Sequence, residues 1–337
     1  MNDITEGGRN ITPLRIRRIA PRPELDHTKK AHEARGITAP DPEKDFVDID
    51  LEEFVSLDFA GGRITLEPSN LCNLRCRYCA VPKDDPCDID WDRIAYIFKL
   101  VKLRGMSTAV ITGGEPGIFR DIRRIISDLH SWGFYVSLLT NGTWASQMDR
   151  ARELVGLGLT EVHVSMKEFT KGSFLSLTGR DLFERSRQGL ENISSLRRDG
   201  SLRYFHMNHV ITRYSFPVRN IIDFFDAFDF CPDLFLITMV EPIKGRDYDL
   251  VPQLDMLLRE LDVLLSYLDA RRIPFRVEGV PLCMLGDRIA ASLDRAHMSD
   301  NDYRVFVTFK EHRDSVFVFR GWQRFLQFAH GKGCDAC

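Results

Sequence analysis

The sequence predicts an α/β protein: a partial (β/α)6 barrel of the TIM type, followed by a C-terminal extension that carries cysteines. Between residues 60 and 272, short apolar runs alternate with longer helical patterns six times in succession. Repeated strand–helix units of this kind favour a parallel sheet with helices packed outside it. A closed barrel contains eight such units, so that six indicate an open, partial barrel.

The predicted strands are short and rich in apolar residues. They comprise residues 63–67, 108–112, 135–140, 161–166, 204–211 and 235–239. The helical segments between them carry apolar side chains three and four residues apart, as at Ile94, Ile97 and Val101. These helices comprise residues 91–104, 118–132, 145–157, 181–199, 217–228 and 252–271. In such a sheet, ligands bind at the C-terminal ends of the strands.

Both ends of the chain differ from this regular part. Residues 1–50 are poor in large apolar side chains and contain several prolines, which indicates a flexible N-terminal arm. The barrel covers residues 60–272, and the C-terminal extension covers 273–337. In the extension, three further strands are expected at 275–280, 304–309 and 316–319.

The composition is that of an ordinary globular chain. Of 337 residues, 44% are hydrophobic and 28% are charged, and the formal net charge is −3. This balance does not require nucleic acid as a partner. No apolar run approaches the roughly 20 residues that span a bilayer, and the first residues lack an apolar signal core. We expect a cytoplasmic protein without a membrane partner.

Eight cysteines in a cytoplasmic chain indicate metal or redox chemistry, because that compartment keeps thiols reduced. Cys72, Cys76 and Cys79 directly follow the first predicted strand, and a tight loop can turn their sulfurs toward one point. Thiolates are the ligands that iron–sulfur clusters require, and three of them leave one iron of a four-iron cluster open for chemistry. The alternative is a structural zinc site, for which Cys87 is the nearby fourth ligand.

The spacing C-x-x-x-C-x-x-C, with the aromatic Tyr78 before the last cysteine, resembles the signature of the radical S-adenosylmethionine family. The resemblance implies that a [4Fe–4S] cluster binds the amino and carboxylate groups of S-adenosylmethionine at its open iron. It further implies reductive cleavage of this cofactor to a 5′-deoxyadenosyl radical, which abstracts hydrogen from a substrate. An electron donor such as a flavodoxin or ferredoxin is then needed.

Further positions at the strand ends match the same family. Gly113, Gly114, Glu115 and Pro116 end the second predicted strand and resemble the family's G-G-E-P segment, which contacts the amino group of S-adenosylmethionine. Asn141 lies in a T-N-G turn after the third strand, where an ordinary turn is the alternative. The remaining candidate cofactor contacts are Tyr78, Ser165, Lys167, Arg213, Met239 and Val240, of which the last two would hold the adenine.

Cysteines recur near the C-terminus. Cys283, Cys334 and Cys337 resemble, in shortened form, the ligands of an auxiliary iron–sulfur cluster in the SPASM/twitch-like extensions of this family. Cys231, Cys87, a substrate group or solvent would supply the fourth ligand. A zinc site, a redox-active pair and unligated thiols are the alternatives.

These features predict a radical S-adenosylmethionine enzyme that modifies a peptide or natural-product precursor, since auxiliary clusters are frequent in such relatives. The alternative substrate is a sugar, nucleoside or amino acid, and the third hypothesis is a metal-binding scaffold without catalysis. The sequence identifies no catalytic acid or base; Cys231 and Cys87 are candidate hydrogen-donating thiols for an epimerase. His206 and His209 lie three residues apart on one strand and so face opposite ways, which makes them a poor metal pair.

Overall fold

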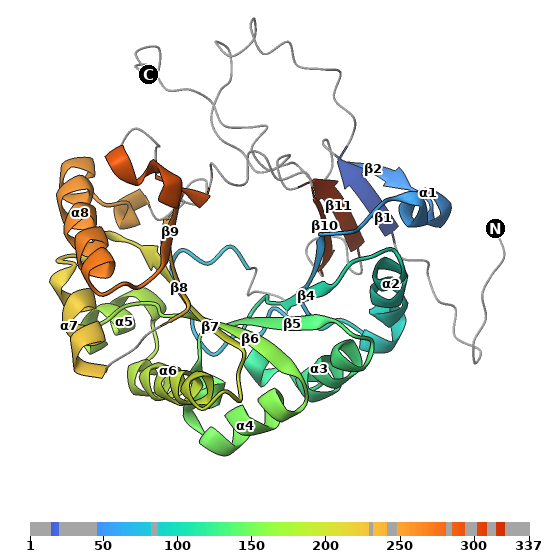
Figure 1. Cartoon of the computed structure of the whole chain (residues 1–337), viewed down its shortest axis with the longest axis horizontal. Coiled ribbons are helices and arrows are strands. Elements are labelled where there is room, and N and C mark those ends of the chain that lie inside the picture. Colours follow the sequence, from blue (N-terminus) through green and yellow to red (C-terminus); the bar gives the residue numbers. More distant parts are fainter. Residues whose placement is uncertain are drawn as a thin grey trace, which may run out of the picture.

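The computed structural model describes residues 15–19, 46–81, 87–228, 232–240, 248–280, 285–293, 302–308 and 315–320. The strands form one curved sheet with helices along its outer side, as Figure 1 shows. The sheet has eleven strands in the order β2-β1-β11-β10-β3-β4-β5-β6-β7-β8-β9. The chain therefore has the α/β fold with an open, partial barrel that its sequence predicts.

The central strands are parallel and follow one another in chain order. They are β3 (Arg63–Leu66), β4 (Thr108–Ile111), β5 (Tyr135–Thr140), β6 (Leu159–Ser165), β7 (Tyr204–Ile211), β8 (Leu234–Met239) and β9 (Phe275–Glu278). Each pairs in parallel with the next. The six predicted strands are confirmed as β3 to β8, and β9 continues the parallel sheet into the predicted extension.

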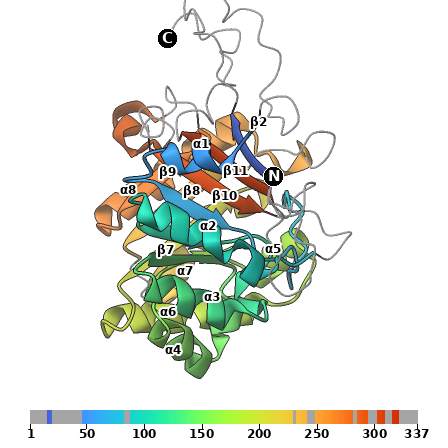
Figure 2. The ribbon, with the colours of Figure 1, turned by 90° about the vertical axis from the view of Figure 1, so that its right-hand side faces the viewer.

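Helices connect these strands. They are α2 (Trp91–Leu103), α3 (Ile122–Ser131), α4 (Met148–Gly156), α5 (Lys171–Thr178), α6 (Phe183–Arg198), α7 (Arg219–Phe228) and α8 (Leu254–Ala270). Figure 2 shows α2, α3 and α4 stacked along the outside of the strands. The connecting segments contain the 3₁₀ helices η2 (Pro116–Ile118), η3 (Thr143–Ser146), η4 (Arg213–Ser215), η5 (Tyr248–Leu250) and η7 (Gly286–Ala291). The sequence prediction omits α5, because its apolar pattern is short.

The helices bury one apolar face against the sheet. In α2, the apolar side chains of Ile94, Ile97 and Val101 are completely buried, whereas Leu103 at the helix end is exposed. Asp90 caps the N-terminus of α2 by accepting a hydrogen bond from the backbone N–H of Asp92. Burial of one such side chain contributes about 1.5–3 kcal/mol. The spacing of apolar residues therefore determines which face of the helix meets the sheet.

The N-terminal region departs from the predicted arm. Within residues 1–50, β1 (Arg15–Ile19) and β2 (Phe46–Ile49) are antiparallel neighbours at one edge of the sheet, and α1 (Leu51–Ser56) follows them. The expectation of a flexible arm is wrong for these two strands. Arg15 of β1 pairs with Ser315, 300 residues further along the chain, and Ile16 is buried in the core. Local composition does not reveal so distant a partner.

The C-terminal extension adds strands at both sides of the barrel. β9 forms one edge, β10 (Tyr303–Thr308) is parallel to β3, and β11 (Ser315–Arg320) is antiparallel to β10. Four cysteines lie outside the described residues. They are Cys231, upstream of β8, and the expected cluster ligands of the extension, Cys283, Cys334 and Cys337. None of the described helices has the length and apolar character that crossing a bilayer requires.

Candidate functional site

The cysteine segment, residues 69–81, lies at the C-terminal end of β3. Cys72, Cys76 and Cys79 are partly buried. The backbone N–H of Cys79 donates to the Cys76 carbonyl at 3.2 Å and closes a tight turn. Asn70 and Cys87 hold the start of the segment: the N–H of Asn70 donates to the Cys87 carbonyl at 3.2 Å, and the N–H of Cys87 donates to Asn70 Oδ1 at 2.8 Å.

The middle of the cysteine segment is hydrogen-bonded to the end of α5. The N–H groups of Arg75 and Arg77 donate to the carbonyls of Thr178 and Leu177 at 2.9 and 3.0 Å. The last carbonyls of an α-helix have no partner within the helix itself. The helix that sequence analysis omits therefore has a direct role in positioning the cysteines.

The G-G-E-P segment packs against the backbone that precedes the cysteines. The N–H groups of Gly114 and Glu115 donate to the carbonyls of Ser69 and Leu71 at 2.8 and 2.7 Å. A Cβ atom at Gly114 would lie 2.1 Å from the Leu71 carbonyl oxygen, and Gly113 has a φ of +111°. Both positions require glycine, because the two chain segments approach each other so closely.

Glu115 is buried, and its carboxylate joins the ends of β4 and β5. It accepts hydrogen bonds from the Thr140 hydroxyl at 2.5 Å, the Asn141 N–H at 2.7 Å and the Gly117 N–H at 3.0 Å. Burial raises the pKa of Glu115, although these donors act in the opposite direction. Pro116 begins η2 directly afterwards. Glu115 thus positions the turn after β5, and its contact with the amino group of the cofactor stays a prediction.

The turn after β5 reaches the cysteine segment through side-chain amides. Asn141 Nδ2 donates to Asn73 Oδ1 at 2.8 Å, and Asn73 Nδ2 donates to the Thr143 hydroxyl at 2.8 Å. Asn141 also accepts a hydrogen bond from the N–H of Thr143 at 3.0 Å. Since Asn73 directly follows Cys72, these bonds restrict the position of the first cysteine.

Lys167 places a cation beside the thiols. Its ammonium group donates to the Ser165 hydroxyl at 2.7 Å and lies 5.8 Å from the centre of the Tyr78 ring. Burial lowers the pKa of Lys167, but the negative charges of ionised Tyr78 and of cysteine thiolates raise it by more, so that the Lys167 ammonium and the thiolates stabilise each other. The structure thus brings Ser165, Lys167 and Tyr78 together with the cysteines.

The donor set of the segment fits an iron–sulfur cluster. Three sulfur atoms come from one short loop, and an ammonium group beside them offsets the negative charge of their thiolates. Burial raises the pKa of the Cys72 thiol to about 11, so that a free thiolate is unfavourable there. Metal ligation is a means by which a buried cysteine becomes ionised.

Arg213, a candidate carboxylate partner, already pairs with a protein carboxylate. It is exposed at the start of η4, and its guanidinium lies 3.1 Å from Asp249. Asp249 also pairs with Arg77 of the cysteine segment at 2.8 Å. The ion pairs connect the η4–η5 region to the cysteines, at the outer rim of the site.

Met239 and Val240, the candidate adenine contacts, end β8 in apolar surroundings. Val240 is buried in a small cluster with Leu177 and Leu250, and Tyr78 packs against this cluster. Met239 packs, partly buried, against the main core. The structure brings Val240 and Tyr78 into one cluster, and their contact with adenine stays a prediction.

The concave side of the barrel encloses a cavity of about 660 Å³. Most of its lining residues are every second residue of β10 and of β3 to β9, so that their side chains point to the concave side of the sheet. Charged side chains among them are Arg63, Arg276, Arg304, Glu161 and Glu278. The lining extends to Thr112, directly before the G-G-E-P segment, so that the cavity reaches the end of the barrel where the cysteines lie.

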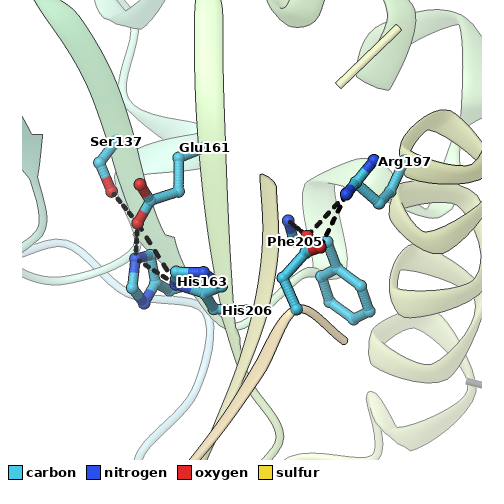
Figure 3. Close-up of polar contacts among 7 residues, drawn as sticks. Ser137, Glu161, His163, Arg197, Phe205 and His206 are labelled. Carbon is cyan, nitrogen blue, oxygen red and sulfur yellow. Dashed lines mark hydrogen bonds and ion pairs between the residues drawn. The ribbon is translucent and has the colours of Figure 1, made fainter. Parts of the chain in front are cut away.

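Glu161, His163 and His206 form a polar cluster in this cavity (Figure 3). Glu161 and His163 alternate along β6, and His206 is the β7 residue paired with His163. Sequence analysis missed this cluster, although the spacing of two that puts Glu161 and His163 on one face is a usable signal. The structure places His209 on the other face of β7, completely buried, with its Nδ1 3.0 Å from the Met166 carbonyl.

Comparison with known families assigns the central part of the chain. Residues 66–231 match the model of the Radical SAM superfamily. A probable GTP 3′,8-cyclase of Sulfurisphaera tokodaii is 30% identical over 166 residues, which are 48% of this chain and 50% of that protein. A probable GTP 3′,8-cyclase of Saccharolobus islandicus is 32% identical over 133 residues, 39% of this chain and 42% of that protein.

Solved structures share the fold. SuiB of Streptococcus suis bound to S-adenosylmethionine superposes with a TM-score of 0.52 at 18% identity, covering 68% of this chain and 52% of that one. SuiB bound to its precursor peptide SuiA gives a TM-score of 0.55 at 16% identity over 83% and 63% of the two chains. Native anSMEcpe with bound AdoMet and a peptide gives a TM-score of 0.51 at 20% identity, covering 64% of this chain and 63% of that one.

Residues 66–231 therefore form a domain of the radical S-adenosylmethionine superfamily, whose members are enzymes that use a [4Fe–4S] cluster and S-adenosylmethionine. The matched segment contains the three cysteines, the G-G-E-P segment and β4 to β7. The chain spans about half the length of the curated relatives that it matches.

Proposed function

We propose that Cys72, Cys76 and Cys79 hold the [4Fe–4S] cluster of this chain, with S-adenosylmethionine beside them at the C-terminal ends of the strands. The observation that supports this most is the convergence of three thiols and the Lys167 ammonium at that edge of the sheet. When bound, the cluster and cofactor supply reductive cleavage to a hydrogen-abstracting 5′-deoxyadenosyl radical. A flavodoxin or ferredoxin is a suitable electron donor.

The chain's own residues have distinct roles in this proposal. Gly114 and Asn73 hold the cysteine segment in position through their close backbone and amide contacts. Lys167 offsets the negative charge of the thiolates. The cavity surrounds the substrate and excludes water, which limits side reactions of a radical.

To test the radical chemistry, the anaerobically reconstituted chain is incubated with S-adenosylmethionine and a strong reductant, and 5′-deoxyadenosine is measured. We expect the native chain and Cys87→Ala to form 5′-deoxyadenosine, and Cys76→Ala to form none. Cys87 is the matched control, because it is the described cysteine outside the triplet and is similarly buried. A native chain that binds the cluster yet forms no 5′-deoxyadenosine would support a scaffold without catalysis.

We further propose that the substrate is a small anionic molecule such as a nucleotide. Arg63, Arg276 and Arg304 line the cavity, and guanidinium groups pair well with phosphate and carboxylate. The relatives with the name probable GTP 3′,8-cyclase agree with this class. A peptide or natural-product precursor, the class to which the SuiA ligand of SuiB belongs, is the second candidate.

The two substrate classes are distinguished by which compound accelerates 5′-deoxyadenosine formation. GTP is expected to raise the rate in the native chain and to do so less in Arg276→Ala, since the arginine would bind its phosphates. Stimulation by candidate precursor peptides and not by GTP would favour the peptide class. Thermal stability of Arg276→Ala, measured in parallel, shows whether the variant is folded.

A further inference from the structure

The Glu161–His163–His206 cluster has the donor atoms and the spacing of a metal site. The Nδ1 atom of His206 lies 3.3 Å from Nε2 of His163 and 3.4 Å from a carboxylate oxygen of Glu161. His163 Nε2 also contacts this oxygen. The three groups offer ligand atoms that all lie within 4.8 Å of one another.

The two separations that involve His206 match the geometry of a small divalent ion. Zinc binds imidazole nitrogen and carboxylate oxygen at about 2.0–2.2 Å. Two ligands at that distance and at a tetrahedral angle lie about 3.3 Å apart, which is the separation that His206 shows to both partners. His206 therefore needs little movement to share one ion with either of its two partners.

The surroundings of the cluster also favour ligation. The side chains of Glu161, His163 and His206 are only 15–19% exposed, and they face the cavity. Ser137 donates a hydrogen bond to Glu161 at 3.3 Å, as Figure 3 shows. Outer hydrogen bonds of this kind orient the ligands of protein metal sites.

We propose that Glu161, His163 and His206 bind a divalent first-row transition ion such as Zn²⁺, with its open coordination positions facing the cavity. Two imidazoles and one carboxylate are the ligand set of catalytic zinc sites and of mononuclear non-haem iron sites. The open positions would accept an oxygen atom of a molecule bound in the cavity.

This site is separate from the cysteines. Along β6, Ser165 lies two residues beyond His163, about 7 Å at the usual strand rise, and Lys167 with the cysteines lies beyond Ser165. The ligands are nitrogen and oxygen atoms of the strands, whereas the cysteine segment offers sulfur. The inference therefore does not depend on the proposed radical chemistry.

The test is titration of the full-length chain, before cluster reconstitution, with Zn²⁺ against a chelator of known affinity and with Co²⁺ followed by absorption. Thiolate-bound Co²⁺ gives intense charge-transfer bands, whereas Co²⁺ bound by nitrogen and oxygen gives weak ligand-field bands. We expect the ligand-field signal to persist in Cys76→Ala and to be lost in Glu161→Gln and His206→Gln. In these two variants, the affinity of this site for Zn²⁺ should fall about 100-fold or more. Removing a residue that only hydrogen-bonds to a metal ligand already lowers metal affinity by about 10- to 100-fold.

The matched control is Glu278→Gln, which changes a carboxylate in the same cavity outside the cluster. It should bind Zn²⁺ as the native chain does. The proposal is overturned if the native chain shows no ligand-field signal, or if Glu278→Gln loses as much affinity as Glu161→Gln. Circular dichroism and thermal unfolding of each variant separate loss of the site from loss of the fold.

Discussion

Gly114 sets how closely the turn after β4 approaches the cysteine segment. A Cβ atom there would meet the Leu71 carbonyl oxygen at 2.1 Å, so that one of the two backbone segments must move. We expect Gly114→Ala to lower the free energy of unfolding by about 1–3 kcal/mol, as overpacking does. Iron bound after reconstitution should also fall, because the displaced segment carries the cysteines.

Gly156→Ala is the control for this prediction. Gly156 ends α4, and an added Cβ atom would have no neighbour within 4 Å. Stability and iron content should be unchanged, or stability slightly raised. Urea unfolding and iron analysis on the same samples make the comparison, and native-like values for Gly114→Ala would show that the close approach is not a constraint.

His209 makes the stability of the fold sensitive to acid. Burial lowers the pKa of His209 to about 4, from an ordinary value of 6.5. Between these values the unfolded chain binds a proton that the folded chain does not, so that stability is complete above pH 6.5 and falls as the pH drops toward 4. From pH 7 to pH 5 this loss amounts to about 2 kcal/mol.

His209→Gln should therefore lose less stability than the native chain when the pH falls from 7 to 5, whatever its stability at pH 7. Urea unfolding at the two pH values measures the difference. His130→Gln, at an exposed position in α3, is the control for replacing a histidine by glutamine. Equal acid sensitivity of native chain and His209→Gln would contradict the assignment.

Sequence reasoning places together residues whose spacing along the chain carries the information. The three cysteines and the G-G-E-P segment each lie within a few residues, and they occupy one end of the barrel in the structure. The cavity cluster was missed because it depends on strand register. His163 and His206 are 43 residues apart, and only the pairing of β6 with β7 brings their rings together.

At the scale of elements, α1 connects the N-terminal strands to the core. Its Phe54 is completely buried, with its ring 5.2 Å from that of Phe59. We expect Phe54→Ala to lower the free energy of unfolding by about 3–5 kcal/mol, because a large cavity replaces the ring. Leu51→Ala, at a 47% exposed position in the same helix, should change it by less than about 0.5 kcal/mol.

Urea unfolding of both variants measures whether the N-terminal region unfolds with the barrel. A small effect of Phe54→Ala would mean that α1 and its neighbouring strands contribute little to the folded unit, as the sequence-based expectation of an arm implies. The structure favours the large effect, since β1 lies between β2 and β11 within the sheet.

Periodicity predicted the elements whose partners are adjacent in sequence. The strands β3 to β8 and the helices α2 to α4 alternate along the chain, so that each strand pairs with the next one. The strand β1 alternates arginines with single isoleucines, which resembles a polar arm, and β2 is only four residues long. Their place became clear only through pairing with β11, at the other end of the chain.

At the scale of the whole molecule, the open barrel carries the two proposed ligand sets at different levels of its strands. Sulfur atoms lie at the C-terminal ends of the strands, and the imidazole and carboxylate groups of β6 and β7 lie further along the lining. The enclosed volume of about 660 Å³ is in the usual range for a small-molecule site. Bound substrate would therefore lie between the two sets.

Iron analysis can determine how many iron–sulfur clusters each chain binds. The test variant has alanine at Cys72, Cys76 and Cys79 together, which removes every sulfur ligand of the proposed first cluster. If Cys283, Cys334 and Cys337 bind a second cluster, we expect about four irons to remain after anaerobic reconstitution, against about eight in the native chain. A variant without iron would mean that the C-terminal thiols hold no cluster, and zinc analysis of the same sample would then distinguish a zinc site from unligated thiols.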